Sequence, residues 1–389
     1  MSRFFASRQS FWTTLEHRFA RPSYSGGLLS SLSVFFFIAA TNTMTGWLYV
    51  MSGILLALLG IAFWLVRKNL RSLTIERQPI EPVSVGDVLQ ISFRLHNAST
   101  APKTLLQIID RIPPALGPAI EQVIDQIPPR GSTQVTLSQS TSRRGIYQWQ
   151  QIQLRTGAPL GLFWASRSQR LPTRAIVHPR VYPLSACPLM DQMGRDESLQ
   201  QINARLAQAS PEGMTRSLRP YRTGDVMRMI HWRASAKLGE LRVRELENFT
   251  SGQSIVIALD SAYDWEEADF EAAVSVAATL YFYGLRQQLQ VQVWTAGNGL
   301  VHGGRSVLDT LAGVQPNEWR TGRDRLAMPE EAMIWLTARP ESTTDLPLGS
   351  RWLLWPGQGD ASGNAIGNAQ VGYRMNQTDP LPLQLTQLV

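Results

Sequence analysis

The densest group of side chains that could bind an anion lies between Met214 and Arg244. This stretch contains eight arginine or lysine residues against two acidic residues. Arginine presents a rigid fork of N–H donors that suits carboxylates and phosphates, and tryptophan offers a large contact area. The stretch therefore predicts a surface that recognises an anion or an acidic protein partner. The residues assigned to it are Arg219, Tyr221, Gly224, Asp225, Arg228, Trp232, Arg233, Ser235 and Lys237.

Three other interpretations of this basic segment are structural ion pairs, nucleic-acid binding and a Ser–Lys nucleophile. The arginines could form ion pairs with acidic residues of adjoining domains and thereby hold the fold together. Nucleic acid is a weaker alternative, because the basic patch is short. A Ser–Lys nucleophile at Ser235 and Lys237 is disfavoured, since helical residues two positions apart point in different directions.

The elements that would position these side chains are a loop, a helix, a turn and a strand. Asp225 is a favourable N-cap for a helix from Val226 to about Leu238, and Gly239 is placed to end that helix in a left-handed conformation. The alternation over residues 241–246 predicts a strand. The buried face of the helix and turn is predicted to consist of Met227, Ile230, Ala234, Leu238 and Leu241.

An α/β unit is predicted after this segment. Strand and helix patterns alternate in the order 254–259, 269–289, 291–294, 306–312 and 333–337. Such alternation predicts a mostly parallel sheet, whose ligands bind beyond the carboxyl ends of its strands. Asp260 directly follows the first strand and lies at that edge. Residues 351–389 are rich in Gly, Ala, Asn and Ser at first and then in Pro, Leu and Gln, and we expect a loop-rich tail there.

A β-rich region is predicted between residues 73 and 183. Short alternating runs separated by turn residues indicate an antiparallel β-sandwich of immunoglobulin-like type. The predicted strands are Val88–Asn97, Thr104–Ile109, Gln134–Gln139, Tyr147–Arg155 and Ala175–Val177. No catalytic triad, metal cluster or phosphate loop is visible in this region, so we expect a structural or adhesive role for it.

Two uncharged apolar stretches near the N-terminus predict a transmembrane hairpin. They run from Tyr24 to Thr41 and from Gly46 to Val66, and each is near the length that spans a bilayer. Their outer flanks are rich in arginine, whereas residues 42–45 carry no charge. The positive-inside rule therefore predicts a multi-pass protein of the cell membrane with two spans and both termini in the cytoplasm. The alternative is a buried hairpin in a soluble protein.

Composition narrows the possible function classes. Most of the net charge of +7 comes from the flanks of the hairpin, so the basic balance is weak evidence for nucleic-acid binding. A single cysteine, Cys187, excludes an intramolecular disulfide. The five histidines are scattered without metal-ligand spacing, and no Walker loop is present. We therefore expect no enzymatic activity and no cofactor, and we rank a hydrolase last.

Four sequence blocks resemble those of the domain-of-unknown-function-58 family. They are Arg143–Tyr147 (RRGIY), Pro159–Phe163 (PLGLF), Arg219–Asp225 (RPYRTGD) and Ile230–Lys237 (IHWRASAK). The resemblance implies two membrane spans, a β domain, the basic motif and a domain similar to von Willebrand factor A. It also implies partners, namely a MoxR-type AAA+ ATPase and a transglutaminase-like membrane protein. The family has no established catalytic activity.

Domains similar to von Willebrand factor A carry a metal-ion site that starts with an Asp-x-Ser-x-Ser loop. Here the loop reads Asp260-Ser-Ala-Tyr-Asp264, and Ala338 stands at the second acidic position. A hard divalent cation needs several oxygen ligands. Asp260, Ser261 and Asp264 are thus weak metal candidates, and we expect no metal. Asp260 could instead cap the following turn or pair with an arginine of the basic motif.

These observations lead to two hypotheses of function. The first is a non-enzymatic membrane-tethered scaffold or adaptor that presents cytoplasmic surfaces to protein partners. The alternative is a binding module for an anionic small ligand at the basic motif. The predicted organisation is 1–23, a cytoplasmic segment; 24–66, the hairpin; 73–183, the sandwich; 184–250, a connecting region with the motif; 251–350, the α/β domain; and 351–389, the tail.

Overall fold

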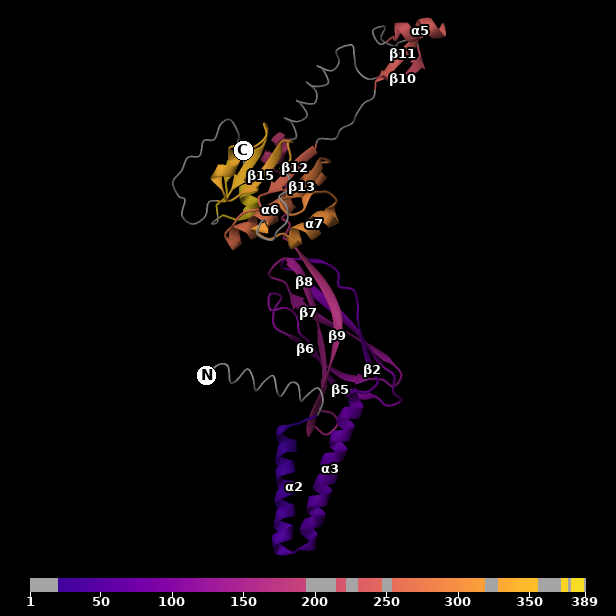
Figure 1. Cartoon of the computed structure of the whole chain (residues 1–389), viewed down its shortest axis with the longest axis vertical. Coiled ribbons are helices and arrows are strands. Elements are labelled where there is room, and N and C mark those ends of the chain that lie inside the picture. The colour runs from indigo at the N-terminus through magenta and orange to yellow at the C-terminus, as the bar shows by residue number, and fades with distance from the viewer. Residues whose placement is uncertain are drawn as a thin grey trace. The chain divides into compact units, whose positions relative to one another are not determined.

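The computed structural model describes residues 20–193, 215–221, 230–246, 254–318, 328–355, 372–376 and 379–387. The chain divides into two compact units, Met1–His178 and Pro179–Val389. The first unit contains two long helices followed by strands, and the second contains an α/β sheet (Figure 1). This order confirms the predicted sequence of an apolar helical hairpin, a β-rich region and an α/β region.

Helices α2 and α3 are long and apolar enough to span a membrane. Helix α2 covers Tyr24–Thr43 and helix α3 covers Gly46–Leu70. Only 17% and 22% of their most apolar windows are buried, so the outer faces leave large apolar side chains exposed, including Phe35, Phe37, Ile38, Val50, Ile54 and Ile61. Soluble proteins rarely expose so continuous an apolar surface. Most of the hairpin therefore lies outside the core of the first unit, although Val66 and Leu70 at the end of α3 are buried in it.

Small polar residues join the two helices. The hydroxyl of Ser33 donates to the carbonyl of Ser52 at 3.2 Å, and the hydroxyl of Ser52 donates to the carbonyl of Ser33 at 3.0 Å. Both residues are almost fully buried. Small residues and hydrogen bonds between helices are typical of helix pairs in membranes, where apolar burial provides no driving force.

The strands of the first unit form two sheets that share one core. One sheet contains β2 (Leu73–Arg77), β4 (Val88–Asn97) and β7 (Ser132–Ser140). The other has the order β1 (Arg21–Pro22), β9 (Phe163–His178), β8 (Gly145–Thr156), β5 (Lys103–Asp110) and β6 (Ile120–Ile127), with β3 (Val83–Ser84) beside β9. Alternate residues of both sheets point into this core, as in a sandwich.

The sequence predicted five of these strands and missed others. Strand β4 has the predicted bounds, and β5, β7 and β8 extend the predicted runs by a few residues. Strand β9 is far longer than the predicted run Ala175–Val177, because a register shift opposite Trp149 lets the strand continue through Pro172. Strand β6 was missed because only two of its eight residues are buried, which leaves little alternation.

A buried ion pair connects the two sheets of the sandwich. Arg77 of β2 donates to Asp110 of β5 at 2.7 Å, and the indole N–H of Trp149 donates to both carboxylate oxygens at 3.0 and 3.2 Å. Burial lowers the pKa of Arg77 and raises the pKa of Asp110, and their mutual attraction opposes both shifts. Loss of one partner would leave a buried charge, so the pair fixes the register of one sheet on the other.

The loop between β8 and β9 attaches the sandwich to the helices. The carbonyl of Leu162 accepts the N–H of Ser23 at 2.8 Å and lies against Gly26, where an added Cβ would overlap it. Leu162 is buried with Leu59 and Ala62 of α3. At the end of α3, the Asn69 side chain donates to the sandwich at 3.0 and 3.2 Å. The hairpin and the sandwich are therefore packed and hydrogen-bonded together at these points.

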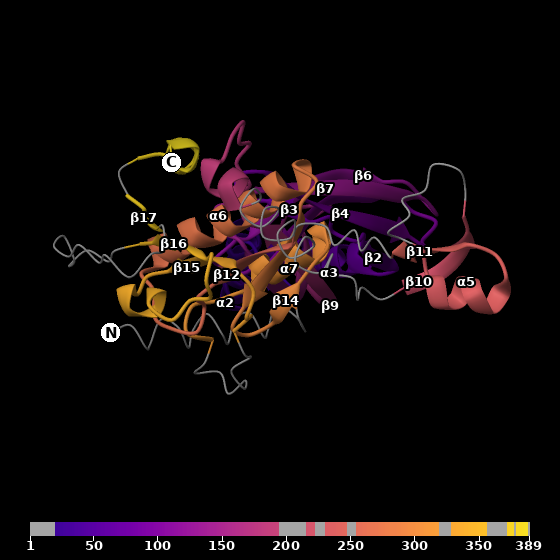
Figure 2. The same ribbon diagram turned by 90° about the horizontal axis from the view of Figure 1, so that it is seen from above.

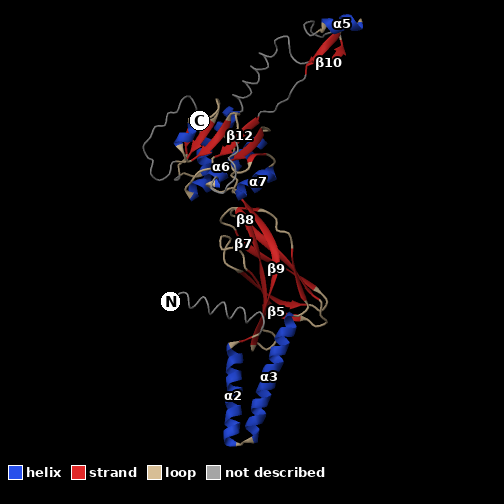
Figure 3. Cartoon of the chain, in the orientation of Figure 1, coloured by secondary structure: helices blue, strands red, loops and turns tan. Residues whose placement is uncertain are grey.

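The second unit contains a mostly parallel sheet with the order β14-β13-β12-β15-β16-β17, and Figure 2 shows β16, β15 and β12 as neighbours. The strands are β12 (Ser254–Leu259), β13 (Gln290–Thr295), β14 (Gly299–Val301), β15 (Met333–Thr337), β16 (Arg351–Leu354) and β17 (Gly372–Arg374). Among the described strands of this sheet, β14 alone pairs antiparallel. Helices α6 (Glu267–Arg286) and α7 (Gly304–Gly313) accompany it, as Figure 3 shows. A further helix, α8, covers Leu381–Gln387.

Most predicted elements of this unit are confirmed. The prediction of a loop-rich tail after residue 350 is wrong, because two strands and a helix lie there. Arg351–Leu354 is a fully buried strand, and β17 and α8 follow it. The run from Arg351 to Trp355 is short and apolar, and the Gly-rich residues after it obscured the pattern. Leu385 of α8 is buried in the same core as α6 and α7. The described residues after 350 therefore extend the sheet and contribute to its core.

We predict that Gly26→Ala destabilises the first unit by about 1–3 kcal/mol, because the new methyl group meets a backbone carbonyl that cannot rotate away. Gly27→Ala is the matched control, since nothing lies within 4 Å of a Cβ there. The measurement is the thermal unfolding midpoint of the full chain in detergent, followed by near-ultraviolet circular dichroism. Equal midpoints for the two variants would contradict the close contact at Leu162.

Candidate functional site

The basic segment forms a small strand–helix–strand element. Strand β10 (Thr215–Pro220) pairs antiparallel with β11 (Arg242–Leu246), and helix α5 (Trp232–Leu238) lies between them in sequence. Within the described residues the helix begins at Trp232 and is shorter than predicted. Ile230 instead forms a bridge with Val243, and His231 is the N-cap, accepting the N–H of Ala234 on Nδ1 at 3.1 Å.

The predicted buried face of this helix is only partly correct. Ile230 is 4% exposed, but Leu238 and Leu241 are 56% and 45% exposed. The helix has only seven residues, so the three- and four-residue steps do not extend over a continuous face. Gly239 ends the helix with a φ of 71°, as predicted. Met227 lies outside the described residues.

The nine predicted binding residues divide into three groups. Gly224, Asp225 and Arg228 lie outside the described residues, as does the side chain of Arg219. Two residues contribute to the element itself: the N–H of Tyr221 donates to Leu241 at 2.8 Å, and the buried Ser235 hydroxyl accepts the N–H of Arg242 at 2.8 Å. Trp232, Arg233 and Lys237 are exposed on α5, with Trp232 at 64%.

The carboxylate of Asp260 is held by an arginine. Asp260 is 3% exposed beyond the carboxyl end of β12. Its Oδ2 accepts the hydroxyl of Thr337 at 2.9 Å and lies 3.4 Å from Nη2 of Arg339. The guanidinium of Arg339 also lies 3.2 Å from the ring centroid of Tyr263. One partner of Asp260 is thus an arginine that follows β15, and its pairing with an arginine of the basic motif stays a prediction.

The other two metal candidates have different partners. The hydroxyl of Ser261 donates to Oε2 of Glu318 at 2.7 Å and accepts the N–H of Ala296 at 3.1 Å. The Asp264 carboxylate accepts the side-chain amide of Asn317. No group of three or more His, Cys, Asp or Glu able to hold a metal occurs in the described part of the chain. The three candidates are therefore hydrogen-bonded within the chain, and the absence of a metal stays a prediction.

Glu318 and Arg339 are the residues of this edge that sequence reasoning missed. Glu318 also accepts the N–H of Gly297 at 2.9 Å, so it links the ends of two strands. It lies 57 positions after its partner Ser261, and no motif spans that interval. Arg339 directly follows Ala338, which stands where an acidic residue was expected, and nothing else in the sequence indicated its role. The group that this edge offers for chemistry is the guanidinium of Arg339 stacked on the ring of Tyr263, and not a cluster of carboxylates.

Comparisons with known proteins provide no assignment. No family model matches the chain, and no curated protein matches it. Among solved structures, the CARDB domain of a Pyrococcus furiosus protein is 13% identical, covering 27% of this chain and 94% of that one, with a TM-score of 0.18. A putative late embryogenesis abundant protein is 12% identical over 32% and 84%, with a TM-score of 0.21. A β-glucosidase from Listeria innocua is 7% identical over 27% and 16%, with a TM-score of 0.18.

We predict that Arg339→Gln destabilises the second unit by about 1–3 kcal/mol, because it leaves the buried Asp260 carboxylate without its charged partner. Asp260→Asn combined with Arg339→Gln should recover part of this loss, since the buried charge is then absent. Thermal unfolding of the three variants forms the test. A midpoint that rises by many degrees with magnesium, and only when Asp260 is present, would show instead that a cation binds there.

Proposed function

We propose that this chain is a non-enzymatic, membrane-tethered scaffold or adaptor that presents cytoplasmic surfaces to protein partners. The observation that carries the proposal is the hairpin of α2 and α3, whose outer faces expose large apolar side chains while its inner face is joined by Ser33 and Ser52. Such an arrangement is suited to lipid on the outside. The contact at Gly26 then holds a folded sandwich next to the bilayer.

We further propose membership of the domain-of-unknown-function-58 family. Two of its sequence blocks have structural roles that support the resemblance. Pro159–Phe163 forms the attachment of the sandwich to the helices through Leu162, and Ile230–Lys237 forms the bridge, cap and helix of the basic element. On this proposal the sandwich is immunoglobulin-like and the α/β unit is similar to von Willebrand factor A. The loop that starts at Asp260 beyond β12 supports the second likeness.

The partner proposed is a MoxR-type AAA+ ATPase, with a transglutaminase-like membrane protein as a further member of the assembly. The surface proposed for the ATPase is the exposed part of α5, made of Trp232, Arg233 and Lys237. Tryptophan and arginine are the residue types most often found at the centres of protein interfaces. Trp232 is 64% exposed, although burial of its ring would favour folding. An exposed tryptophan and two exposed cations on one short helix suit an acidic protein surface.

The orientation in the membrane is tested by labelling. Both termini should face the cytoplasm, because the arginine-rich flanks stay on that side. In a Cys187→Ala variant, a cysteine at Asn42 should react with an impermeant thiol reagent added outside intact cells, and a cysteine at Asp125 should not. Cys187 is buried, and burial raises its pKa to about 11. We therefore expect its own reaction with the reagent to be slight, and its replacement removes that small background. Labelling at 125 alone would reverse the topology.

The partner surface is tested by a paired set of variants. Trp232→Ala with Arg233→Ala should weaken capture of the purified MoxR-type ATPase at least about tenfold, since a lost hot spot commonly costs ~2 kcal/mol. The melting temperature should change little because both side chains are exposed. Ser235→Ala is the structural control: it removes the acceptor for Arg242 N–H and should lower stability without changing affinity per folded molecule.

The second candidate function is a binding module for an anionic small ligand at the basic motif, and the same variants distinguish it from a partner surface. Arg233 and Lys237 are exposed one turn apart on α5, a spacing that also suits an anionic small ligand. If inorganic phosphate or a nucleotide binds the wild-type chain and the ATPase does not, the element is a ligand-binding module. A double variant that melts early yet captures the ATPase normally would place the partner surface elsewhere.

A further inference from the structure

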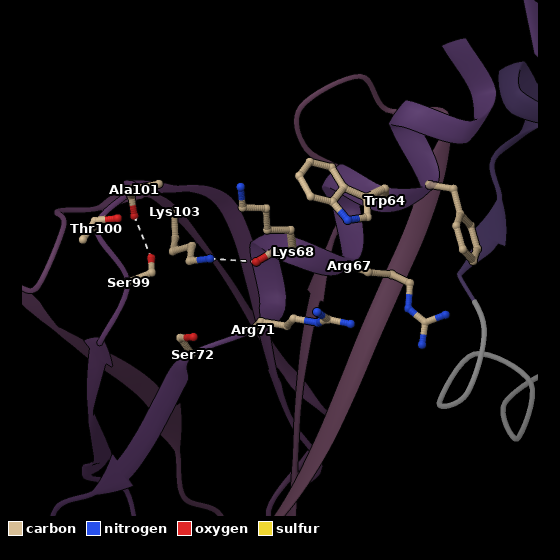
Figure 4. Close-up of a pocket in the computed structure, with 10 residues that line it drawn as sticks. Trp64, Arg67, Lys68, Arg71, Ser72, Ser99, Thr100, Ala101 and Lys103 are labelled. Atoms are coloured by element: carbon tan, nitrogen blue, oxygen red, sulfur yellow. Dashed lines mark hydrogen bonds between the residues drawn. The ribbon is translucent and has the colours of Figure 1, made fainter. Parts of the chain in front are cut away.

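A basic pocket of about 580 Å³ lies where the end of α3 meets the sandwich (Figure 4). Four of its lining residues are cationic, namely Arg67, Lys68, Arg71 and Lys103, and two are the aromatic residues Phe63 and Trp64. The first three cations lie at the end of α3, and Lys103 is contributed by β5. No acidic side chain is among the lining residues in the described part of the chain. The described lining therefore concentrates positive charge at the end of α3 and at Lys103.

Lys103 is built into the wall of this pocket. It is 4% exposed, and its ammonium donates to the carbonyl of Lys68 at 2.8 Å, as the dashed line in Figure 4 shows. That carbonyl is one of the last in α3, and it also accepts the backbone N–H of Arg71 at 3.3 Å. Burial, together with the positive charge of Lys68, lowers the pKa of Lys103. An anion in the pocket would relieve both effects, because it would offset the repulsion and stabilise the charged ammonium.

The aromatic residues make the pocket amphipathic. The ammonium of Lys68 lies 4.6 Å from the ring centroid of Trp64, and the guanidinium of Arg67 lies 5.4 Å from that of Phe63. Trp64 is 57% exposed on the last turns of α3. Tryptophan favours the level of the headgroups in a bilayer, and cations at a helix end extend their charged groups to the same level. The pocket thus combines cations with an apolar surface that continues along the helix.

We propose that this pocket binds the phosphate of an anionic phospholipid headgroup, with the acyl chains along the exposed apolar face of α3. The inference rests on the proposed membrane anchoring. A lipid is favoured over free phosphate because two of the pocket's lining residues are aromatic rings on the last turns of the span. Cations next to a membrane span attract anionic lipid, and basic pockets between helix ends recognise headgroups. The bound lipid would hold the junction between helix and sandwich at a defined depth.

The test measures lipid binding to the full chain in neutral detergent by native mass spectrometry. Dioleoyl phosphatidylglycerol should bind at least tenfold more tightly than dioleoyl phosphatidylcholine. Lys68→Gln combined with Arg71→Gln should remove most of this preference. Arg94→Gln combined with Arg174→Gln is the matched control, because it removes the same charge from exposed sandwich residues that do not line the pocket. Both double variants should melt close to the wild-type temperature, since all four side chains are exposed.

Each result supports or overturns the inference. Equal binding of the two lipids, or an equal loss in both double variants, would mean that the pocket does not select a headgroup. Glycerol 3-phosphate that displaces the phosphatidylglycerol at equal concentration would identify a site for free phosphate instead of a lipid. Alkaline extraction of membranes distinguishes failure of the lipid proposal from failure of the proposed membrane anchoring. A chain that stays in the membrane but shows no lipid preference would contradict the lipid proposal alone. A chain that alkali extracts from the membrane would contradict the proposed anchoring.

Discussion

The carbonyl of Leu162 lies against helix α2 at a position where no side chain larger than hydrogen fits. This contact requires Gly26, and it brings the β8–β9 loop between the ends of two apolar helices. The hydrogen bonds of Asn69 and Lys103 reinforce it from the side of α3. Because α3 ends at Leu70 and β2 begins at Leu73, the chain has little length in which the sandwich could turn away. The basic pocket exists only because this junction is close.

Local patterns predicted the elements well where burial is strongly one-sided. Strands β4, β12 and β15 have the predicted bounds because their residues alternate or are wholly apolar within clear turn signals. Strand β16 was missed although all four of its residues are buried, since an apolar run of that length does not distinguish a strand from a loop. The helix after Asp225 was predicted too long, because Ile230 satisfied a helical period and a strand bridge equally.

The candidate sites were less predictable than the elements, because their partners are distant in sequence. Asp260 was identified from its place after a strand, but its ion pair with Arg339 depends on how β12 and β15 align. Ser261 and Glu318 meet in the same way. Ser235 was named as a binding residue, yet it is a backbone acceptor within its own element. Residue type and spacing suggested the right regions, while the geometry decided which side chains remain exposed.

Strand β9 gives the junction a mechanical consequence. It begins at Phe163, whose ring packs on Phe63 of α3 at 5.7 Å, and it continues for 16 residues to His178. At a rise of about 3.3 Å per residue, such a strand is roughly 50 Å long. Transmembrane helices change their tilt when bilayer thickness changes. If the sandwich follows α3, a tilt of about 10° displaces the far end of β9 by roughly 9 Å. On the proposed membrane anchoring, the first unit is then a lever that converts a change in bilayer thickness into lateral movement above the membrane surface.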